Sequence, residues 1–228
     1  NSTVGELVYL NNEVHAGAVR EKDLAYEYEV YEGDHTFMPE QLADAFYFVL
    51  DAFDNPPSKP KRWHHADLYS DFEVWGYEIQ SNLDEPGFIE LRGVTDGGLG
   101  ITTKKWQPHG RTIPGVKIQV KTAPVYQRNS TYHLLDYNQT TKKSNRTMVT
   151  SDAEGRIQFD VDHHPHQIGI FKEEDPAEMV FLSYRVDGDE SAFLEHKKTC
   201  SMKLQLLNRG GTAAEGMKVT LSTTTGGL

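Results

Sequence analysis

One histidine in the sequence, His35, has surroundings that suit acid–base chemistry. It lies in the stretch VYEGDHTF, between a strand-like run that breaks at Gly33 and a segment with the pattern of a helix. Gly33 permits a sharp turn, so the loop can present the imidazole at the edge of a sheet. An imidazole titrates near neutral pH, so it can take a proton from a hydroxyl and return it. His35 is therefore a candidate catalytic base, and the alternative is a structural loop histidine.

Two predicted helices and one predicted strand would position this loop. Apolar residues recur at helical spacing from Leu10 to Val19 and predict the first helix. The alternation in LAYEYEVY, residues 24–31, predicts a strand. Pro39 suits a first helical turn, and the apolar stripe from Leu42 to Phe53 predicts a second helix.

The proline-rich stretch DNPPSKPKR separates this region from sequence of another kind. We assign residues 1–54 to a first domain, 55–62 to a linker and 63–196 to a β-sandwich. Nine short alternating or β-branched runs between residues 72 and 186 predict an immunoglobulin-like sandwich. Residues 197–228 predict two further strands around a glycine-rich turn, which either complete the sandwich or open another domain.

The segment Asn11 to Phe53 resembles the C-terminal end of the putative-esterase branch of the α/β-hydrolase superfamily, which includes feruloyl and other carbohydrate esterases. In that family the segment is a helix, a strand ending in Tyr-X-Gly-X-His and a closing helix, and this chain has Tyr31-Glu32-Gly33-Asp34-His35. The resemblance covers under a quarter of the chain. It implies the end of an α/β-hydrolase sheet, with His35 as the base of a catalytic triad.

The other two members of such a triad are not evident. No Gly-X-Ser-X-Gly elbow occurs in the 228 residues, so the serine would come from an upstream hydrolase portion of the same polypeptide or from a second chain. Where the family has an acidic residue in a Gly-Thr-X-Asp-like loop, this sequence has Gly5 and Glu6. Glu6 is therefore the candidate acid, unless the acid is lost. The chain resembles the C-terminal piece of a longer polypeptide.

The β region resembles accessory β domains of such esterases in exported polysaccharide-degrading systems, on the stretches beginning HADLYSDF and TSDAEGRIQF. Aromatic residues here could stack on a polysaccharide, although core packing is the commoner role of such residues. They are Trp63, Trp75, Tyr77, Trp106 and Tyr126.

Histidine clusters occur in DHHPH, residues 162–166, and HHAD, residues 64–67. Neighbouring histidines on a strand point to opposite faces, so His163 and His164 can bind one ion only if the backbone turns there, as Pro165 could cause. We expect polar loops rather than metal sites, and no cofactor. The acidic turn at 187–190 offers too few oxygens for calcium.

Composition restricts the partners and the location. There are 23 Lys and Arg against 34 Asp and Glu, a net charge of −11 with scattered basic pairs, which argues against nucleic acid. No apolar run approaches the roughly 20 residues that span a bilayer, so no membrane partner is expected. The single cysteine, Cys200, excludes an internal disulfide. Sequons at Asn1, Asn129, Asn138 and Asn145 favour a secreted or extracytoplasmic protein.

Three functions are consistent with these patterns. The first is the C-terminal portion of an exported serine carboxylic-ester hydrolase. The second is a non-catalytic carbohydrate-binding or adhesion protein built on the sandwich, and the third is a purely structural domain. The sequence leaves the ester substrate open.

Overall fold

The computed structural model describes residues 12–17, 19, 39–56, 58–186 and 201–220. The chain divides into two compact units, Asn1–Lys59 and Pro60–Leu228, at a point within the proline-rich stretch. Each unit is described by itself. None of the helices in the described residues has the length and apolar character that crossing a membrane requires.

The described part of the first unit is helical. Residues 12–17 and 19 have helical geometry, and helix α2 runs over Pro39–Asp54, so both predicted helices are confirmed where they can be seen. At the end of α2 the Asn55 amide donates to the Asp51 carbonyl (2.8 Å), and Pro56 follows, which disfavours continuation of the helix. The predicted strand at 24–31 lies outside the described residues, and no α/β-hydrolase sheet is seen among those that are described.

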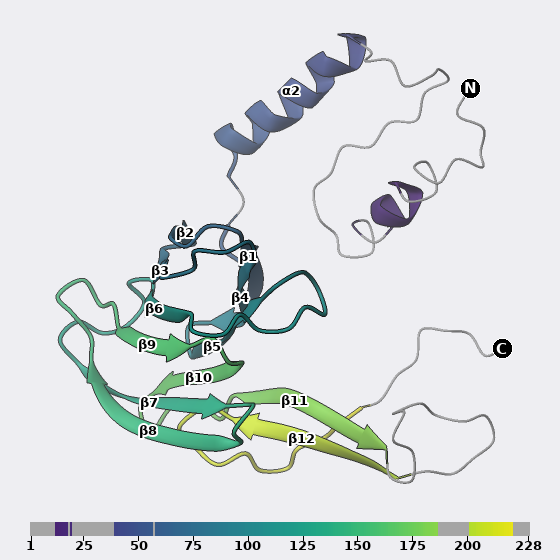
Figure 1. Ribbon diagram of the computed structural model, residues 1–228. Coiled ribbons are helices and arrows are strands. Elements are labelled where there is room, and N and C mark those ends of the chain that lie inside the picture. The colour runs from purple at the N-terminus through teal and green to yellow at the C-terminus, as the bar shows by residue number, and fades with distance from the viewer. Residues whose placement is uncertain (1–11, 18, 20–38, 57, 187–200, 221–228) are drawn as a thin grey trace. The chain divides into compact units, whose positions relative to one another are not determined.

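The second unit consists mostly of antiparallel sheets (Figure 1). The larger sheet has six strands in the order β1 (Trp63–Asp67), β4 (Phe88–Thr95), β5 (Gly98–Lys104), β10 (His166–Phe171), β7 (Thr131–Asn138) and β8 (Lys143–Thr150). The smaller has four, in the order β2 (Phe72–Val74), β3 (Tyr77–Ser81), β6 (Lys117–Lys121) and β9 (Gln158–Asp162). The predicted β-sandwich architecture is consistent with this arrangement.

One hydrophobic core joins the two sheets. In β6 and β9, burial alternates along each strand, so that Ile118, Val120, Phe159 and Val161 all point inward. The opposing sheet buries residues from five of its strands against them, namely Ile89, Leu91, Val94, Leu99, Ile101, Tyr132, Ile168, Ile170 and Trp63. This period-two burial is the physical basis of the strand predictions, because successive side chains point to opposite faces.

The structure corrects two of the predicted strand boundaries. The run FEVWGYEIQ is a hairpin of β2 and β3, because Trp75 (φ 51°) and Gly76 (φ 81°) both adopt the left-handed backbone that a tight hairpin turn requires. Residues 63–67 were predicted to lie in the sandwich with the histidine cluster 64–67 in a polar loop, but they form β1 and pair with β4.

The last described segment forms a third, two-stranded sheet of β11 (Met179–Val186) and β12 (Met202–Asn208). The first of the two strands predicted after Cys200 is thus β12. The second was predicted to begin near residue 217, and its described part, residues 217–220, forms no strand. Residues 209–212 instead fold back, with the Thr212 amide donating to the Asp175 carbonyl (2.9 Å). The side chain of Gln205 in β12 donates to the Tyr137 hydroxyl of β7 (3.0 Å), which ties this sheet to the larger one.

Strand β10 is buried along its whole length, and at Gly169 the chain at residue 209 covers the face that points away from the core. A Cβ placed on Gly169 would lie 2.4 Å from the Arg209 carbonyl oxygen, so only glycine permits this close approach. At the far edge of the sheet β8 pairs with β7 alone, and nearly all of its residues are exposed.

The side chain of Arg209 is 1% exposed and is the largest of the fully buried side chains among the described residues. Its guanidinium donates to the Gly93 carbonyl (2.8 Å), to Thr95 Oγ1 (3.2 Å) and to Glu178 Oε1 (2.7 Å). Exposed Arg62 donates to the same carboxylate oxygen at 3.3 Å. Two arginines of very different burial therefore share one acidic partner.

We expect Arg209→Ala to lower the free energy of unfolding by about 3–5 kcal/mol, because it removes one partner of a buried ion pair. Arg62→Ala is the matched control, and should cost under about 1 kcal/mol because its pair with Glu178 is exposed to solvent. Urea unfolding of the full chain, followed by tryptophan fluorescence, measures both. Equal losses for the two variants would contradict the role assigned to burial.

Candidate functional site

The residues predicted to carry ester hydrolysis, His35 and Glu6, lie outside the described residues. The same holds for Cys200 and for the acidic turn at 187–190. The candidate sites among the described residues all belong to the second unit.

The aromatic residues predicted to bind sugar or to fill the core divide between buried and exposed positions. Trp63 (4% exposed) and Tyr77 (0%) are core residues whose rings meet edge to face, with centroids 5.5 Å apart. Trp75 and Trp106 are exposed, at 39% and 56%. Tyr126 is half-buried and lines a cleft.

This cleft has a volume of about 610 Å³, within the range of small-ligand sites. It is lined by residues that are distant in sequence, including Asp96, Tyr126, Tyr132, Lys172, Glu178 and Arg209. The rings of Tyr126 and Tyr132 meet edge to face at 5.1 Å, and Lys172 Nζ lies 5.4 Å from the centre of the Tyr132 ring. The cleft thus combines aromatic surface with ionised groups of both signs.

Hydrogen bonds fix the polar groups of the cleft. The Tyr126 hydroxyl donates to the Asp96 carbonyl (2.9 Å), and Lys172 Nζ donates to Gln127 Oε1 (3.1 Å). Burial raises the pKa of Tyr126 well above its ordinary value of 10.0, so this hydroxyl remains a neutral donor. Arg209 Nε is buried without a hydrogen-bond partner, whereas Nη2 donates to Gly93, Thr95 and Glu178.

Of the residues that line the cleft, the sequence analysis named only Tyr126. Tyr132, Lys172, Glu178 and Arg209 come from separate strands and turns, so no local spacing links them. The one indication of the cleft in the sequence was Arg209, a charged residue that lies between the end of an apolar predicted strand and two glycines.

A second polar cluster surrounds His166, which is 5% exposed at the start of β10. Its Nδ1 lies 2.6 Å from Asp136 Oδ1 and its Nε2 lies 2.9 Å from Asp162 Oδ1. Burial acts to lower the pKa of His166, but the two carboxylate hydrogen bonds outweigh it and hold the pKa above the ordinary value of 6.5. When it is protonated, His166 can donate from both ring nitrogens, one to each carboxylate.

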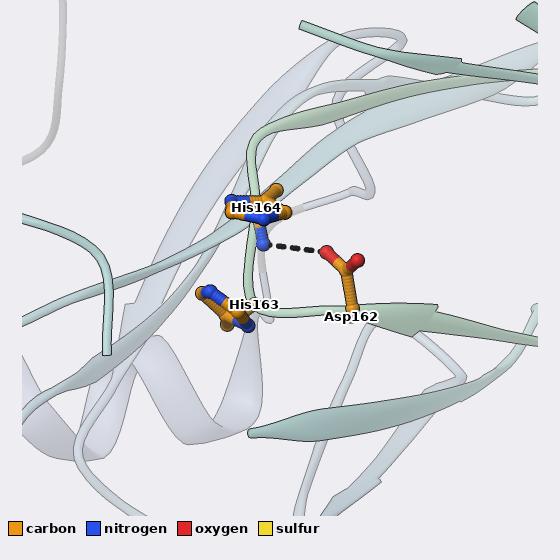
Figure 2. Close-up of side chains that lie close together, drawn as sticks. All are labelled: Asp162, His163 and His164. Carbon is orange, nitrogen blue, oxygen red and sulfur yellow. Dashed lines mark hydrogen bonds between the residues drawn. The ribbon is translucent and has the colours of Figure 1, made fainter. Parts of the chain in front are cut away.

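Next to His166, the chain turns sharply after β9. The His164 amide donates to Asp162 Oδ1 (2.8 Å), which closes an Asx-type turn before Pro165. Figure 2 shows the result, with the rings of His163 and His164 close together beside the Asp162 carboxylate. The ring centroids are 4.1 Å apart, and one potential ligand atom from each of the three residues lies within 4.8 Å of the others. The turn that the sequence analysis required for joint binding is present.

The electrostatics of the turn follow from the same contacts. Burial acts to raise the pKa of Asp162, but the bonds from His166 and from the His164 amide prevail and lower it below its ordinary value of 3.8. Burial and then the neighbouring His164 lower the pKa of His163 below 6.5. At neutral pH the turn therefore carries an ionised carboxylate beside a neutral imidazole.

The other histidine cluster, residues 64–67, is part of β1 and follows strand alternation. His65 Nε2 lies 3.0 Å from Asp67 Oδ2 on one face, whereas His64 Nδ1 accepts a hydrogen bond from the Gly93 amide (3.2 Å). The two histidines serve different partners and do not converge.

We expect the stabilisation from His166 to depend on pH. Its folded-state pKa exceeds the unfolded-state value, so its contribution is complete below about pH 6.5 and is lost as the pH rises through the folded-state value. The difference in free energy of unfolding between the unmodified chain and His166→Gln should therefore shrink from about pH 6 to about pH 9. Urea unfolding in buffer with EDTA measures it, and exposed His109→Gln controls for the substitution. A difference that does not change with pH would be inconsistent with a doubly bonded imidazolium.

The chain was compared with protein-family models, with curated proteins and with solved structures. None of the three comparisons finds a match. The residues of this chain, their geometry and the resemblance of the segment from Asn11 to Phe53 are therefore the only grounds for assigning a function.

Proposed function

We propose that the chain is the C-terminal part of an exported serine carboxylic-ester hydrolase, of the carbohydrate-esterase kind, in which the immunoglobulin-like sandwich is an accessory domain. The single observation that carries the proposal is the ordered segment from Asn11 to Phe53, with a helix, a strand-like run, Tyr-X-Gly-X-His and a closing helix. The serine belongs to an upstream portion of the polypeptide or to a second chain.

The apolar stripe of α2 supports the proposal. Phe46 (58% exposed), Leu50 (52%) and Phe53 (77%) recur at helical spacing and form a continuous apolar stripe, on a helix whose residues 42–54 are all exposed. A helix with such a stripe is stable in water only when the stripe is covered. The closing helix of an α/β-hydrolase covers its sheet through a stripe of this kind, so the hydrolase portion of the polypeptide is a suitable partner.

The chemistry of the proposed reaction is acyl transfer to water. The serine oxygen attacks the ester carbonyl while His35 takes the hydroxyl proton, which it then gives to the departing alcohol. Water attacks the acyl-enzyme by the same route and releases the acid. Backbone amides of the hydrolase portion hold the oxyanion, and Glu6 is the candidate acid that orients the imidazole.

We expect His35→Ala, in the longer polypeptide or two-chain complex that supplies the serine, to lower ester hydrolysis by roughly 10²–10⁴-fold, because general acid–base transfer is lost. Release of p-nitrophenol from p-nitrophenyl acetate is the measurement. His15→Ala, an exposed change in the same unit, is the matched control and should leave the rate unchanged. Unaltered hydrolysis by His35→Ala would rule out the triad role.

The cleft in the second unit favours a second function, carbohydrate binding. Two tyrosine rings offer apolar faces, while Glu178 and Lys172 offer an acceptor and a donor for hydroxyl groups. Such a mixture suits a neutral polyhydroxylated ligand, in which C–H faces alternate with hydroxyls. This function is compatible with an accessory role beside an esterase, and it is also the non-catalytic alternative.

We expect Tyr126→Ala to weaken binding to polysaccharide about tenfold, equivalent to roughly 1.4 kcal/mol, because it removes an aromatic wall of the cleft. The full chain on a glycan array, followed by titration of the sugars that respond, provides the measurement. Trp106→Ala is the control, since this exposed aromatic lies outside the cleft. Silence of the unmodified chain on every sugar would contradict this second function.

A further inference from the structure

The turn after β9 is held rigidly by contacts on both sides. The carbonyl oxygen of His163 accepts a hydrogen bond from Thr103 Oγ1 (3.2 Å), and Thr103 is fully buried. The Pro165 carbonyl accepts from the Gln139 amide (2.8 Å). Residues 163–165 are therefore fixed between the end of β5 and the end of β7, and their side chains project from a defined backbone.

The Asp162 carboxylate is also fixed in orientation. Its Oδ1 accepts from the His164 amide (2.8 Å) and from His166 Nε2 (2.9 Å), while Asp136 holds the other side of the His166 ring at 2.6 Å. Both bonds of this carboxylate end on Oδ1, and among the described residues Oδ2 makes none. A carboxylate–imidazole–carboxylate chain of this type is what orients a metal ligand in many protein sites.

His166 itself cannot serve as a ligand, because both of its ring nitrogens are engaged by carboxylates. Asp162, His163 and His164 each offer one ligand atom, a carboxylate oxygen or a ring nitrogen, and these three atoms lie within 4.8 Å of one another. Ligand atoms around a tetrahedral ion with bonds of about 2.0–2.1 Å lie roughly 3.3–3.5 Å apart, so small side-chain rotations close the site. Figure 2 shows the three side chains gathered around the turn.

We propose that Asp162, His163 and His164 form a binding site for a divalent late first-row transition-metal ion, with Zn²⁺ as the probe ion. A set of two imidazoles and one carboxylate favours such ions over Mg²⁺ and Ca²⁺, because Mg²⁺ and Ca²⁺ bind mainly oxygen ligands. Three protein ligands leave a fourth position for water or for another molecule. The chain's net charge of −11 favours cations generally, whereas the two imidazoles provide the selectivity.

Isothermal titration of the full chain with Zn²⁺, after treatment with EDTA and exchange into chelator-free buffer, tests the proposal. We expect one saturable site, which His163→Ala and His164→Ala each weaken by about 100-fold or more, because each removes a ligand rather than an outer contact. His163→Gln serves as a milder second variant. His109→Ala, an exposed histidine on a different loop, should leave the affinity unchanged.

Cu²⁺ gives an independent measure of ligand identity. Electron paramagnetic resonance of the bound ion should show coupling to two imidazole nitrogens in the unmodified chain and to one in His163→Ala. Circular dichroism verifies that each variant is folded. Absence of saturable Zn²⁺ binding, or binding that the His163 and His164 variants leave unchanged, would overturn the proposal. Equal affinity for Mg²⁺ and Zn²⁺ would overturn the assignment of metal class.

Discussion

The buried guanidinium of Arg209 is the interaction on which the outer layer of the β unit depends. It joins three segments that are remote in sequence, because its donors reach Gly93 and Thr95 of β4 and the carboxylate of Glu178. An ionised group that is 1% exposed requires such partners, since an unpaired buried charge costs several kcal/mol. With these segments joined, the chain at residue 209 packs on Gly169 and covers the middle of β10 on the face away from the core. The same joint forms one wall of the cleft.

Much of the β unit could be predicted from the sequence because its strands obey simple alternation. Ile118 and Val120, or Phe159 and Val161, occur two residues apart and face one core. Prediction failed where the backbone departs from common preferences. The hairpin at Trp75 and Gly76 needs left-handed backbone at a tryptophan, which no propensity indicates. Strand β1 was missed because its polar sequence hides its alternation.

The candidate sites differ in how far local sequence determines them. The turn at Asp162–His164 is made by neighbouring residues. The histidine cluster could therefore be identified from the sequence, and Pro165 indicated the backbone turn that joint binding requires. The cleft is assembled from five separate segments and has no local signature, so only Tyr126 was named in advance. His166 was seen as part of a cluster, but its pairing with Asp136 depends on the register of β7 and β10. His35 and Glu6, the predicted base and acid of the catalytic triad, lie outside the described residues, and their roles stay predictions.

The two ends of the six-stranded sheet limit how the β unit can associate. An edge strand presents a row of free backbone donors and acceptors that a foreign strand could join. At one end β1 has only five residues and a register shift. At the other end β8 carries Lys143 and Arg146, whose charges would lose hydration if a strand were added. Growth of this sheet into fibrils or intermolecular ribbons is therefore opposed at both borders.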